Sequence, residues 1–393
     1  MCGISGIVNF EKNPNINLAK QINKSIQHRG PDYNGTWSNN FCVHSIARLA
    51  IIDLNERANQ PYLSNNKKIS IVYNGEIYNF KELKEKYFPS KKFKTKSDGE
   101  VLLYLYEKLG IEFINLIKGM FAISIADANI KKHFLIRDRF GIKPLFYYYN
   151  KFNKELIFAS EIQAIMQDKR VQRTVNFNET YRYVCNDLIN ASDETWFKNI
   201  YQLKPASFLE ISKDSFKIIK YYKLEDKINE DTELNAKNFK CYSEEIEDKL
   251  LQSYKEHSVF DVNAGIHCSG GADSALLAAL CKHSNQKLKT FTFDYNEKKF
   301  SEAKEAKYIA KWASLENYTS ILEEKDLIDY YFKVLNIQQG PFSSLRVLSQ
   351  HHLYETHREK AKVIFDGSGG DEISAGYGYQ KIALYLDSLG LKN

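Results

Sequence analysis

The first residues of the chain, Met1-Cys2-Gly3-Ile4-Ser5-Gly6, could carry a nucleophile. If Met1 is removed, a thiol and a free α-amine stand on the same residue, and the amine can accept the thiol proton through a water molecule. An α-amine titrates at about 7.7–8.0 and a free thiol near about 8.5, so the two groups are matched for this transfer near neutral pH. The alternative is an ordinary residue close to a disordered terminus, and Cys2 alone does not decide between the two.

Polar clusters downstream of Cys2 could complete such a site. His28-Arg29-Gly30-Pro31-Asp32 is a turn in which glycine and proline force the backbone. The segment Tyr73–Asn79 is predicted to end a strand in an Asn74-Gly75 turn. Such a turn would expose a backbone N–H beside a side-chain amide, which together form the donor pair of an oxyanion hole. Ser97-Asp98-Gly99-Glu100 is predicted to open a helix, with Ser97 as its N-cap and Glu100 at the capping-box position.

Glycine-rich segments mark the second half of the chain. Cys268-Ser269-Gly270-Gly271-Ala272-Asp273-Ser274 is predicted to join a buried strand to the start of a helix. Glycines there let the backbone close on an anion, and the free N–H groups of the helix start act as donors. The segment lacks the Gly-Lys-Ser/Thr ending of a Walker loop, and in isolation it could be a plain turn. A second segment, Asp366–Glu372, is followed by Gly376-Tyr377.

The elements that must position these clusters differ between the two halves. In residues 1 to about 210, short apolar or alternating runs predict strands at 43–52, 68–73, 121–126, 133–137, 145–149 and 156–159. Helical spacing predicts helices at 18–27 and 98–109, so we expect sheets with helices on their outer faces. Residues 211–241 are polar, charged and aromatic without a clear period, and we interpret them as a connection between domains.

From residue 242 strands and helices alternate, which predicts an α/β domain with a parallel sheet and helices on both faces. Strands are predicted at 263–267, 289–293 and 362–365, and helices at 243–256, 274–281, 302–313, 327–334 and 345–359. A length of 393 residues is sufficient for two or three domains, each with its own core.

Composition favours some classes of protein and argues against others. Hydrophobic residues make up 43% and charged residues 26%, as in soluble globular proteins. No stretch approaches the roughly 18 apolar residues of a membrane span, and no secretory signal is recognisable. The six cysteines show neither C-x-x-C nor metal-ligand spacing, so we expect reduced thiols in the cytoplasm. The net charge of +6 is modest and the lysines look scattered, so we expect no nucleic-acid partner and no membrane partner.

The order of the N-terminal clusters resembles the class II glutamine amidotransferase domain, an N-terminal nucleophile hydrolase with an αββα sandwich. The resemblance runs from Cys2 to about Pro205 and includes the segments Arg137–Leu145 and Ala159–Glu161. It implies that Cys2 attacks the side-chain amide of glutamine and releases ammonia, while Asn74 and the N–H of Gly75 hold the oxyanion.

The same resemblance implies a binding site for the α-groups of glutamine. Arg48 would hold the α-carboxylate through a two-pronged hydrogen bond, and Asp98, with Glu76, would hold the α-ammonium. Taken singly, Arg48 could also be a surface strand charge, and Asp98 an acid that interacts with a helix dipole.

The second half resembles the ATP pyrophosphatase family, and the pairing of the two halves resembles the asparagine synthetase family. The resemblance implies that ATP is bound by Ser269, Gly270, Gly271, Asp273, Ser274 and Gly367. It also implies a Mg²⁺ ion held by Asp273 and Asp371 beside the phosphates. A carboxylate would attack the α-phosphate of ATP to form an acyl-adenylate, and ammonia from the first domain would displace AMP. Asparagine made from aspartate is the default product.

Some features depart from that family. Ser368 stands where asparagine synthetases carry glutamate, and Gln339 stands where an acidic residue usually precedes the proline. The sequence stops at Asn393, whereas the family continues with a helical lobe that supplies a catalytic lysine. We therefore expect residues 242–393 to form a truncated synthetase domain, either because the sequence is a fragment of a longer protein or because the synthetase half is incomplete as encoded. Two alternatives therefore stay open: amidation of another carboxylate on a surface sugar, a peptide or another metabolite, or a glutaminase-like binding or regulatory module without synthetase activity. A homodimer is one possible assembly.

Overall fold

The structure, a computed structural model, describes residues 1–189, 192–227, 239–295, 297, 299, 301–342, 344–374 and 376–388. The chain divides into two compact units, one made of Met1–Ala236 with Gln339–Ser343 and the other of Lys237–Gln338 with Ser344–Asn393. Residues 228–238 of the predicted connection lie outside the described residues.

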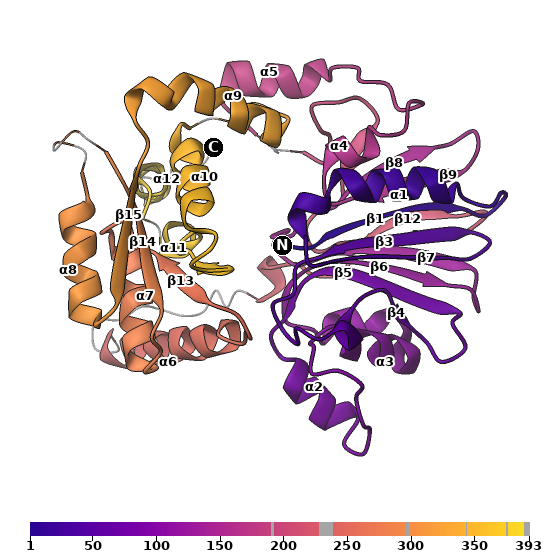
Figure 1. Cartoon of the computed structure of the whole chain (residues 1–393), viewed down its shortest axis with the longest axis horizontal. Coiled ribbons are helices and arrows are strands. Elements are labelled where there is room, and N and C mark those ends of the chain that lie inside the picture. Colours follow the sequence, from indigo (N-terminus) through magenta and orange to yellow (C-terminus); the bar gives the residue numbers. More distant parts are fainter. Residues whose placement is uncertain are drawn as a thin grey trace. The chain divides into compact units, whose positions relative to one another are not determined.

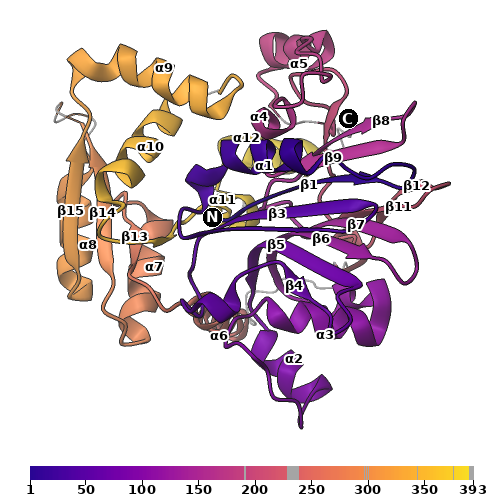
Figure 2. The ribbon, with the colours of Figure 1, turned by 45° about the vertical axis from the view of Figure 1, so that its right-hand side comes forward.

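The first unit contains two six-stranded antiparallel sheets that pack face to face (Figures 1 and 2). The first sheet has the order β10 (Ile200–Gln202), β8 (Phe146–Asn150), β9 (Glu155–Ala159), β1 (Gly3–Asn9), β3 (Cys42–Arg48) and β2 (Tyr33–Ser38). The second has the order β12 (Phe216–Lys220), β11 (Ser207–Ile211), β7 (Lys132–Arg137), β6 (Gly119–Asp127), β5 (Ile69–Ile77) and β4 (Tyr62–Leu63).

Helices cover the outer faces of both sheets (Figure 1). On the first sheet lie α1 (Ile16–Ser25) and α4 (Ile162–Ile165). On the second lies α3 (Glu100–Leu109), and α2 (Phe80–Tyr87) packs against α3; α5 (Phe177–Asn186) follows α4 along the chain. The helix α1 begins where the Asn15 side chain accepts a hydrogen bond from Leu18 N–H, and it buries Ala19 and Ile22 against the sheet. Between the sheets, apolar residues such as Ile46 and Leu135 form the main core. The predicted αββα sandwich is confirmed.

The predicted Asn-Gly turn is wrong. Asn74 and Gly75 lie inside β5, where they pair with Ala122 and Phe121 of β6. A Cβ atom on Gly75 would lie 2.1 Å from the Met120 carbonyl oxygen, so glycine is needed there for close strand approach rather than for a turn.

The predicted capping box at Ser97 is also wrong. The helix α3 begins at Glu100 after Gly99, and no side chain caps it. The Glu100 carboxylate instead accepts hydrogen bonds from the N–H groups of Lys94 (2.9 Å) and Thr95 (2.6 Å). The acid therefore stabilises the loop before the helix.

The strand β12 lies inside the segment that we interpret from sequence as a connection. It is an edge strand that pairs only with β11 in the sheet order, and Ile218 and Ile219 are both substantially exposed. An edge strand with two exposed faces shows no alternation of apolar and polar residues, which explains why the sequence pattern gives no sign of it.

The second unit is built around a four-stranded parallel sheet of order β15 (Glu316–Ile321), β14 (Lys289–Asp294), β13 (Ala264–His267) and β16 (Val363–Phe365). Its helices are α6 (Phe239–His257), α7 (Ala272–His283), α8 (Ala303–Ala313), α9 (Leu327–Gln338), α10 (Arg346–His357), α11 (Gly370–Ser374) and α12 (Gly378–Ser388). Figure 1 shows α7 and α8 on one face of the sheet and α10 on the other. Separate apolar clusters line the two faces, and the predicted α/β class is confirmed.

The strand β15 is not predicted from the sequence, because its residues Glu316-Asn317-Tyr318-Thr319-Ser320-Ile321 are mostly polar. The strand lies at the edge of the sheet, and polar side chains partly replace apolar packing there. The Asn317 amide donates to the hydroxyls of Thr290 (3.0 Å) and Thr292 (2.9 Å) on β14.

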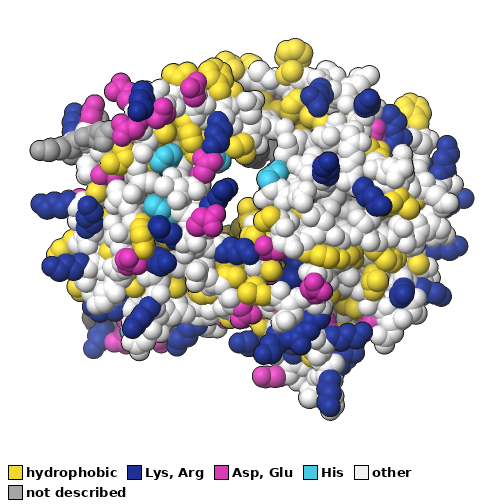
Figure 3. Space-filling model, viewed as in Figure 1, with side chains coloured by type: hydrophobic (Ala, Val, Ile, Leu, Met, Phe, Trp, Pro, Cys, Tyr) yellow, Lys and Arg dark blue, Asp and Glu magenta, His cyan; other side chains and the backbone are white. Residues whose placement is uncertain are grey.

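Lysines gather on α2 and on the segment that follows it (Figure 3). The exposed ones in this segment are Lys81, Lys86, Lys91, Lys92, Lys94 and Lys96. The Lys91 ammonium lies 3.5 Å from the centre of the Tyr104 ring, and the Lys84 ammonium 4.6 Å from that of Phe93. The lysines are therefore less scattered than they look in the sequence, and cation–π contacts within the unit account for part of this cluster.

Among the helices that the structure describes, none combines the length and the apolar character that crossing a bilayer requires.

Candidate active site

Cys2 lies directly before β1, the strand at the centre of the first sheet. Its Sγ accepts a hydrogen bond from Leu49 N–H at 3.3 Å, and Leu49 follows the end of β3. Burial raises the pKa of the Cys2 thiol, an effect that the Leu49 N–H and the charge of Arg48 partly oppose. A thiol in this state needs a base to become a nucleophile.

The predicted cluster His28–Asp32 holds the backbone around Cys2. The Arg29 Nε donates to the Cys2 carbonyl oxygen at 3.0 Å, and its guanidinium also donates to Glu161 at 2.9 Å. Burial alone would raise the pKa of Glu161, but hydrogen bonds from His28 and Arg29 lower it to about 2. Asp32 accepts a hydrogen bond from Ala50 N–H at 2.7 Å. Arg29 therefore holds the backbone at Cys2, and Asp32 holds the backbone just after β3.

The Asn74 side chain is almost fully buried, and its Nδ2 donor has no hydrogen-bond partner. An unpaired buried amide donor costs about 1–3 kcal/mol, so its retention calls for an explanation. Asn74 and Gly75 lie on β5, which contacts β1 across the sandwich. A free donor of this kind is what an oxyanion hole requires before substrate binds.

Asp98 is tied to β5 on both sides of Asn74 and Gly75. Its carboxylate accepts hydrogen bonds from the Tyr73 hydroxyl at 2.5 Å and from Ile77 N–H at 2.8 Å. Burial raises the pKa of Asp98, while these hydrogen bonds act in the opposite direction. Asp98 therefore positions the strand in addition to any contact it makes with a substrate.

Glu76 follows Gly75 on β5 and is half-buried. Burial raises its pKa to about 8, and the nearby charge of Asp98 acts in the same direction. The charge of Glu76 also raises the pKa of the Met1 amine, and the charge of Asp98 raises the pKa of the Cys2 thiol. The structure thus places both predicted acids in the electrostatic environment of the N-terminus.

Arg48 is the last residue of β3 and is buried. Its guanidinium holds the loop that follows, through short contacts to Asn59 Oδ1 (2.8 Å) and the Asp53 carbonyl (2.6 Å) and longer ones to the carbonyls of Asn55 (3.4 Å) and Ile52 (3.3 Å). A substrate carboxylate would have to replace the two longer contacts. The predicted two-pronged grip is therefore not preformed.

In the second unit, the predicted phosphate loop leads into α7, whose N-cap residue Gly271 carries no capping side chain. Gly270 has a φ of +87°, a conformation that favours glycine. The Ser274 hydroxyl donates to the Gly271 carbonyl at 2.9 Å, and Gly271 N–H donates weakly to Ser269 Oγ at 3.4 Å. The helix start keeps donors for an anion, so the segment fits a phosphate group.

The two glycine-rich segments of the second unit lie against each other. A Cβ atom on Gly370 would lie 2.6 Å from Asp273 Oδ1, and one on Gly367 would lie 2.8 Å from Asp273 Cβ. The Asp371 side chain lies beside Gly376, because a Cβ atom there would lie 1.9 Å from Asp371 Oδ1, and Gly376 N–H donates to the Asp371 carbonyl at 3.0 Å. Asp273 and Asp371 belong to no group of three acids, histidines or cysteines among the described residues. In proteins Mg²⁺ is usually held by one or two carboxylates, with substrate phosphates and water molecules completing its coordination.

Asp366 organises the second glycine-rich segment. It pairs with His267 Nδ1 at 2.7 Å and accepts hydrogen bonds from the N–H and the hydroxyl of Ser368. The hydrogen bond from His267 lowers the pKa of Asp366. Ser368, which departs from the family pattern, therefore closes a local turn onto Asp366.

A buried cluster between the two sheets of the first unit corrects another expectation. Cys42 and His44, two residues apart on β3, share a face, and their donor atoms and those of His133 all lie within 4.8 Å of one another. Cys42 and His44 therefore have a spacing that could hold a metal ion, whereas no metal-ligand spacing is predicted for the cysteines from the sequence. Ser124 Oγ lies 2.9 Å from both histidine Nε2 atoms, and His44 Nδ1 lies 3.0 Å from Ser70 Oγ. Hydrogen bonds thus already use most of the ring nitrogens.

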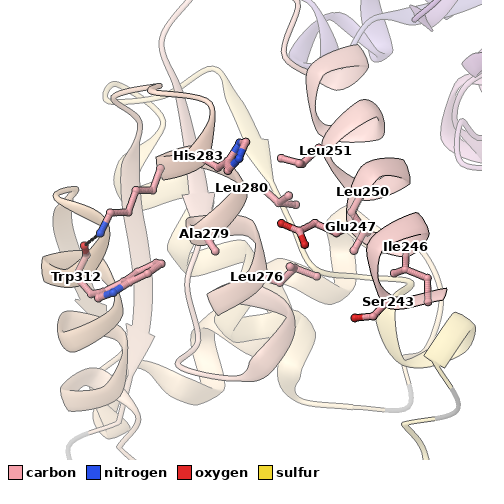
Figure 4. Close-up of a pocket in the computed structure, with 11 residues that line it drawn as sticks. Ser243, Ile246, Glu247, Leu250, Leu251, Leu276, Ala279, Leu280, His283 and Trp312 are labelled. Carbon is pink, nitrogen blue, oxygen red and sulfur yellow. Dashed lines mark hydrogen bonds between the residues drawn. The ribbon is translucent and has the colours of Figure 1, made fainter. Parts of the chain in front are cut away.

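A pocket of about 610 Å³ lies away from these motifs, between α6, α7 and the end of α8 (Figure 4). Mostly apolar side chains line it, including Leu250, Leu276, Leu280 and Trp312. The Lys282 ammonium donates to the Trp312 carbonyl at 2.6 Å at one side. None of the predicted site residues lines this pocket.

Comparison with known proteins gives the family of the chain. Residues 1–222 match the family model described as glutamine amidotransferase domain, and residues 245–390 match the one described as asparagine synthase. Asparagine synthetase (glutamine-hydrolyzing) 2 of Bacillus subtilis is 34% identical over 405 residues, which cover 96% of this chain and 52% of that protein. Putative asparagine synthetase (glutamine-hydrolyzing) 2 of Methanocaldococcus jannaschii is 33% identical over 399 residues, which cover 96% of this chain and 76% of that protein. The chain belongs to the asparagine synthetase family.

The chain spans about half the length of the Bacillus subtilis asparagine synthetase and about three quarters of the archaeal one. Relatives with another name also match. Amidase chry2 of Gibberella zeae is 26% identical over 413 residues, which cover 96% of this chain and 59% of that protein.

Two residues of this asparagine synthetase family member, Arg29 and Gln60, shape the first site but have no site role predicted from the sequence. Arg29 belongs to the polar turn His28–Asp32, and this cluster is the sequence signal from which its role could have been predicted. No sequence signal of this kind marks Gln60. Its side chain accepts a hydrogen bond from Tyr73 N–H at 2.7 Å and donates one to the Tyr73 carbonyl at 3.1 Å, and so makes the backbone hydrogen bonds that a neighbouring strand would otherwise make to β5.

Proposed function

We propose that this chain is an ATP-dependent ligase that hydrolyses glutamine and uses the ammonia to amidate a carboxylate, with aspartate as the default acceptor and asparagine as the product. The observation that supports the proposal most is the pairing, in one chain, of a glutamine amidotransferase domain and an asparagine synthase domain. We place the reaction in the cytoplasm, where the six free thiols would stay reduced.

In the first half of the reaction, removal of Met1 frees the α-amine of Cys2. That amine takes the thiol proton through a water, and the thiolate attacks the side-chain amide carbon of glutamine. The unpaired Asn74 Nδ2 and the N–H of Gly75 hold the oxyanion. Ammonia leaves with the proton held by the amine, and water then hydrolyses the thioester to glutamate. Arg48, Glu76 and Asp98 hold the α-groups of glutamine.

In the second half, the segment Ser269–Ser274 and Gly367 hold the phosphates of ATP at the uncapped start of α7. The acceptor carboxylate attacks the α-phosphate, pyrophosphate leaves, and an acyl-adenylate forms. Ammonia attacks the acyl carbon and displaces AMP, which leaves the amide. Asp273 and Asp371 would hold a Mg²⁺ ion that supplies positive charge for the departing pyrophosphate.

Pyrophosphate release tests this proposal. The chain would be incubated with ATP, Mg²⁺, glutamine and a panel of carboxylates led by aspartate. We expect release that depends on the acceptor, and equal amounts of AMP and amide. Release without any amide, or no release with any acceptor while glutamate accumulates, would contradict the synthetase half of the proposal.

A second acceptor class is favoured by one observation. The side chain of Ser368, at a position where the resemblance implies glutamate, bonds Asp366 and so offers no carboxylate to the site. If the acceptor is another carboxylate, such as one on a sugar or a peptide, the panel will show release with that compound and none with aspartate. Size-exclusion chromatography with light scattering tests the possible homodimer.

A further inference from the structure

The loop between β7 and β8 is folded by two consecutive side chains, Arg137 and Asp138. The Asp138 carboxylate accepts hydrogen bonds from the N–H groups of Phe121, Phe140, Ile142 and Lys143. The Arg137 guanidinium donates to the carbonyls of Lys143 (3.1 Å), Leu203 (2.6 Å) and Gly141 (2.7 Å). Both the N–H and the carbonyl of Lys143 are therefore held in place.

Gly141 completes this loop. Its φ of +67° favours glycine, and a Cβ there would lie 2.8 Å from Pro205 and 3.0 Å from the Arg137 guanidinium. The loop thus has one tightly specified shape, and this shape directs the Lys143 side chain into the interior, where it is 5% exposed.

The Lys143 ammonium donates to the Met1 sulfur at 3.2 Å. A thioether is a weak acceptor, and a buried ammonium normally needs stronger partners. Met1 is the residue that must be removed if Cys2 is to act through its own α-amine. Its removal takes this acceptor away, while the ammonium stays within electrostatic range of Cys2.

The charges around the first residues are mainly positive near neutral pH. Arg29 and Lys143 both act on the amine of Met1 to lower its pKa, in the same direction as burial, which is the largest effect. Glu76 opposes them, but with a pKa of about 8 it is largely protonated at pH 7. The charge of Arg48 lowers the pKa of the Cys2 thiol, and the charge of Asp98 raises it.

Several of the same charges also shift the pKa of the Lys143 ammonium. Burial lowers the pKa of its ammonium, while the charges of Glu76 and Asp138 raise it and that of Arg29 lowers it further. Burial thus acts against the charge of the Lys143 ammonium, while Asp138, and Glu76 where it is ionised, act in its favour.

We propose that Lys143 is a positioning residue of the glutaminase site: once Met1 is removed, its ammonium group faces the α-amine and the thiol of Cys2 and disfavours protonation of both. A neutral amine is the form that accepts the thiol proton, and a nearby positive charge also stabilises the thiolate that forms. The inference deepens the proposed glutamine hydrolysis and therefore depends on it for its catalytic meaning.

The test compares Lys143→Met and Lys143→Gln, which remove the charge, with Lys143→Arg, which keeps it. Lys132→Met is the matched control, because Lys132 lies at the start of β7 and pairs with Glu210 at 2.9 Å, away from Cys2. All variants are made as fusions that cleavage trims to leave Cys2 first, so that differences in Met1 removal do not interfere. Melting temperatures identify the variants that are folded.

The readout is the rate at which iodoacetamide alkylates Cys2 between pH 5.5 and 9.5, measured on the peptide by mass spectrometry. The exposed thiols of Cys185 and Cys241 serve as references in the same sample. Loss of a charge at close range in a partly buried site should raise the midpoint for Cys2 by about one pH unit in the methionine and glutamine variants. The arginine and Lys132 variants should stay within a few tenths of a unit of the wild type, by the same estimate.

Where glutamine hydrolysis is measurable, the acid limb of kcat/KM should move in the same direction as the alkylation midpoint. An unchanged midpoint in both neutral variants, or equal shifts in the neutral and arginine variants, would overturn the inference. Failure of the wild type to hydrolyse glutamine would instead overturn the proposed function, and the alkylation result would still decide whether Lys143 acts on Cys2.

Discussion

Asp98 accepts a hydrogen bond of 2.5 Å from the Tyr73 hydroxyl, which links the start of α3 to β5. Through Ile77 N–H the same carboxylate also holds the far side of the segment that contains Asn74 and Gly75. The oxyanion donors proposed here are therefore fixed in a strand whose two flanks share one buried acid. Fixed donors need no reorganisation when charge develops on the substrate.

Tyr73→Phe should weaken this arrangement without removing a proposed catalytic group. A hydrogen bond to a charged group contributes about 1.5–3 kcal/mol, so we expect a free energy of unfolding lower by about that amount and a kcat/KM for glutamine reduced by about tenfold. Urea unfolding and glutaminase assays measure the two effects. Tyr104→Phe is the control, since its hydroxyl bonds Glu100 at a longer 3.3 Å. Wild-type values for Tyr73→Phe in both assays would refute a positioning role for Asp98.

Asn74→Ala should remove one oxyanion donor. Loss of one such donor costs about 10²–10³ in kcat, and KM should change little because the donor acts in the transition state. Steady-state kinetics of glutamate release measure this. Asn115→Ala, which removes a surface amide bonded to Glu112, should leave both constants unchanged. A rise in KM with kcat preserved would assign Asn74 to substrate binding instead.

Glu76 should make glutamine binding depend on pH. With a pKa of about 8 the side chain is mostly protonated at pH 7, and it must ionise to pair with the α-ammonium of glutamine. The KM for glutamine should therefore fall as pH rises from 7 to 8.5, and Glu76→Gln should raise KM and abolish this slope. Kinetics across that range give the answer, and the same slope in Glu76→Gln would be inconsistent with the role.

The same raised pKa also has a consequence for stability. The folded state binds the Glu76 proton more tightly than the unfolded state, whose carboxyl titrates near the ordinary value of 4.5. The contribution to stability is fully present below about pH 4.5 and is lost as pH rises to about 8. Glu76→Gln should therefore flatten the fall in unfolding free energy over this range, which urea titrations at several pH values can detect.

The buried histidines between the sheets should weaken the fold in acid. Burial lowers the pKa of His44 to about 3, whereas an unfolded histidine titrates near about 6.5. Because the depressed pKa keeps His44 neutral in the folded state, its contribution is present above about 6.5 and is lost as pH falls toward 3, at about 1.4 kcal/mol per pH unit.

Urea unfolding at pH 7.5 and pH 5.0 tests this effect. His44→Gln should shrink the difference in stability between the two pH values. Ser124→Ala is the matched comparison: it breaks the hydrogen bonds to both rings but removes no titrating group, so it should lower stability equally at both pH values. An unchanged pH difference in His44→Gln would show that other groups cause the acid sensitivity.

Asp273→Asn should separate the two halves of the reaction. The side chain lies against the second glycine-rich segment of the second unit, so its loss should abolish pyrophosphate release and leave glutamine hydrolysis intact. Asp326→Asn, in a short helix without a predicted site residue, is the control. Normal pyrophosphate release by Asp273→Asn would remove it from the proposed phosphate site.

Candidate site residues can be named from the sequence more readily than the backbone that carries them can be predicted. Motif residues keep their order and types, so Cys2, Glu76 and Asp98 could be named from the sequence. The same residue types mislead about local structure: Asn74-Gly75 is typical of a turn, yet pairing with β6 keeps it extended. Contacts across the sandwich decide its conformation, and such contacts do not show in a local pattern.

Polar residues that act through tertiary contacts are the hardest to predict. Arg48 has the charge expected of a carboxylate ligand, and its hydrogen bonds to the loop that follows β3 do not show in the sequence. Strands at sheet edges, such as β12 and β15, lack a clear apolar period because water or polar neighbours cover part of each face. The cluster of Cys42, His44 and His133 joins β3 and β7 across the two sheets, so only the topology brings it together.

Transfer of labelled nitrogen is the most direct test of the proposed reaction. The chain would be given glutamine with ¹⁵N in the side-chain amide, ATP, Mg²⁺ and aspartate, and the products followed by mass spectrometry. We predict ¹⁵N-labelled asparagine in equal amount to AMP, and we predict that Cys2→Ala forms asparagine only from added ammonium. Glutamate and free ¹⁵N-ammonium with no labelled amide on aspartate would contradict the proposal that this chain makes asparagine from glutamine.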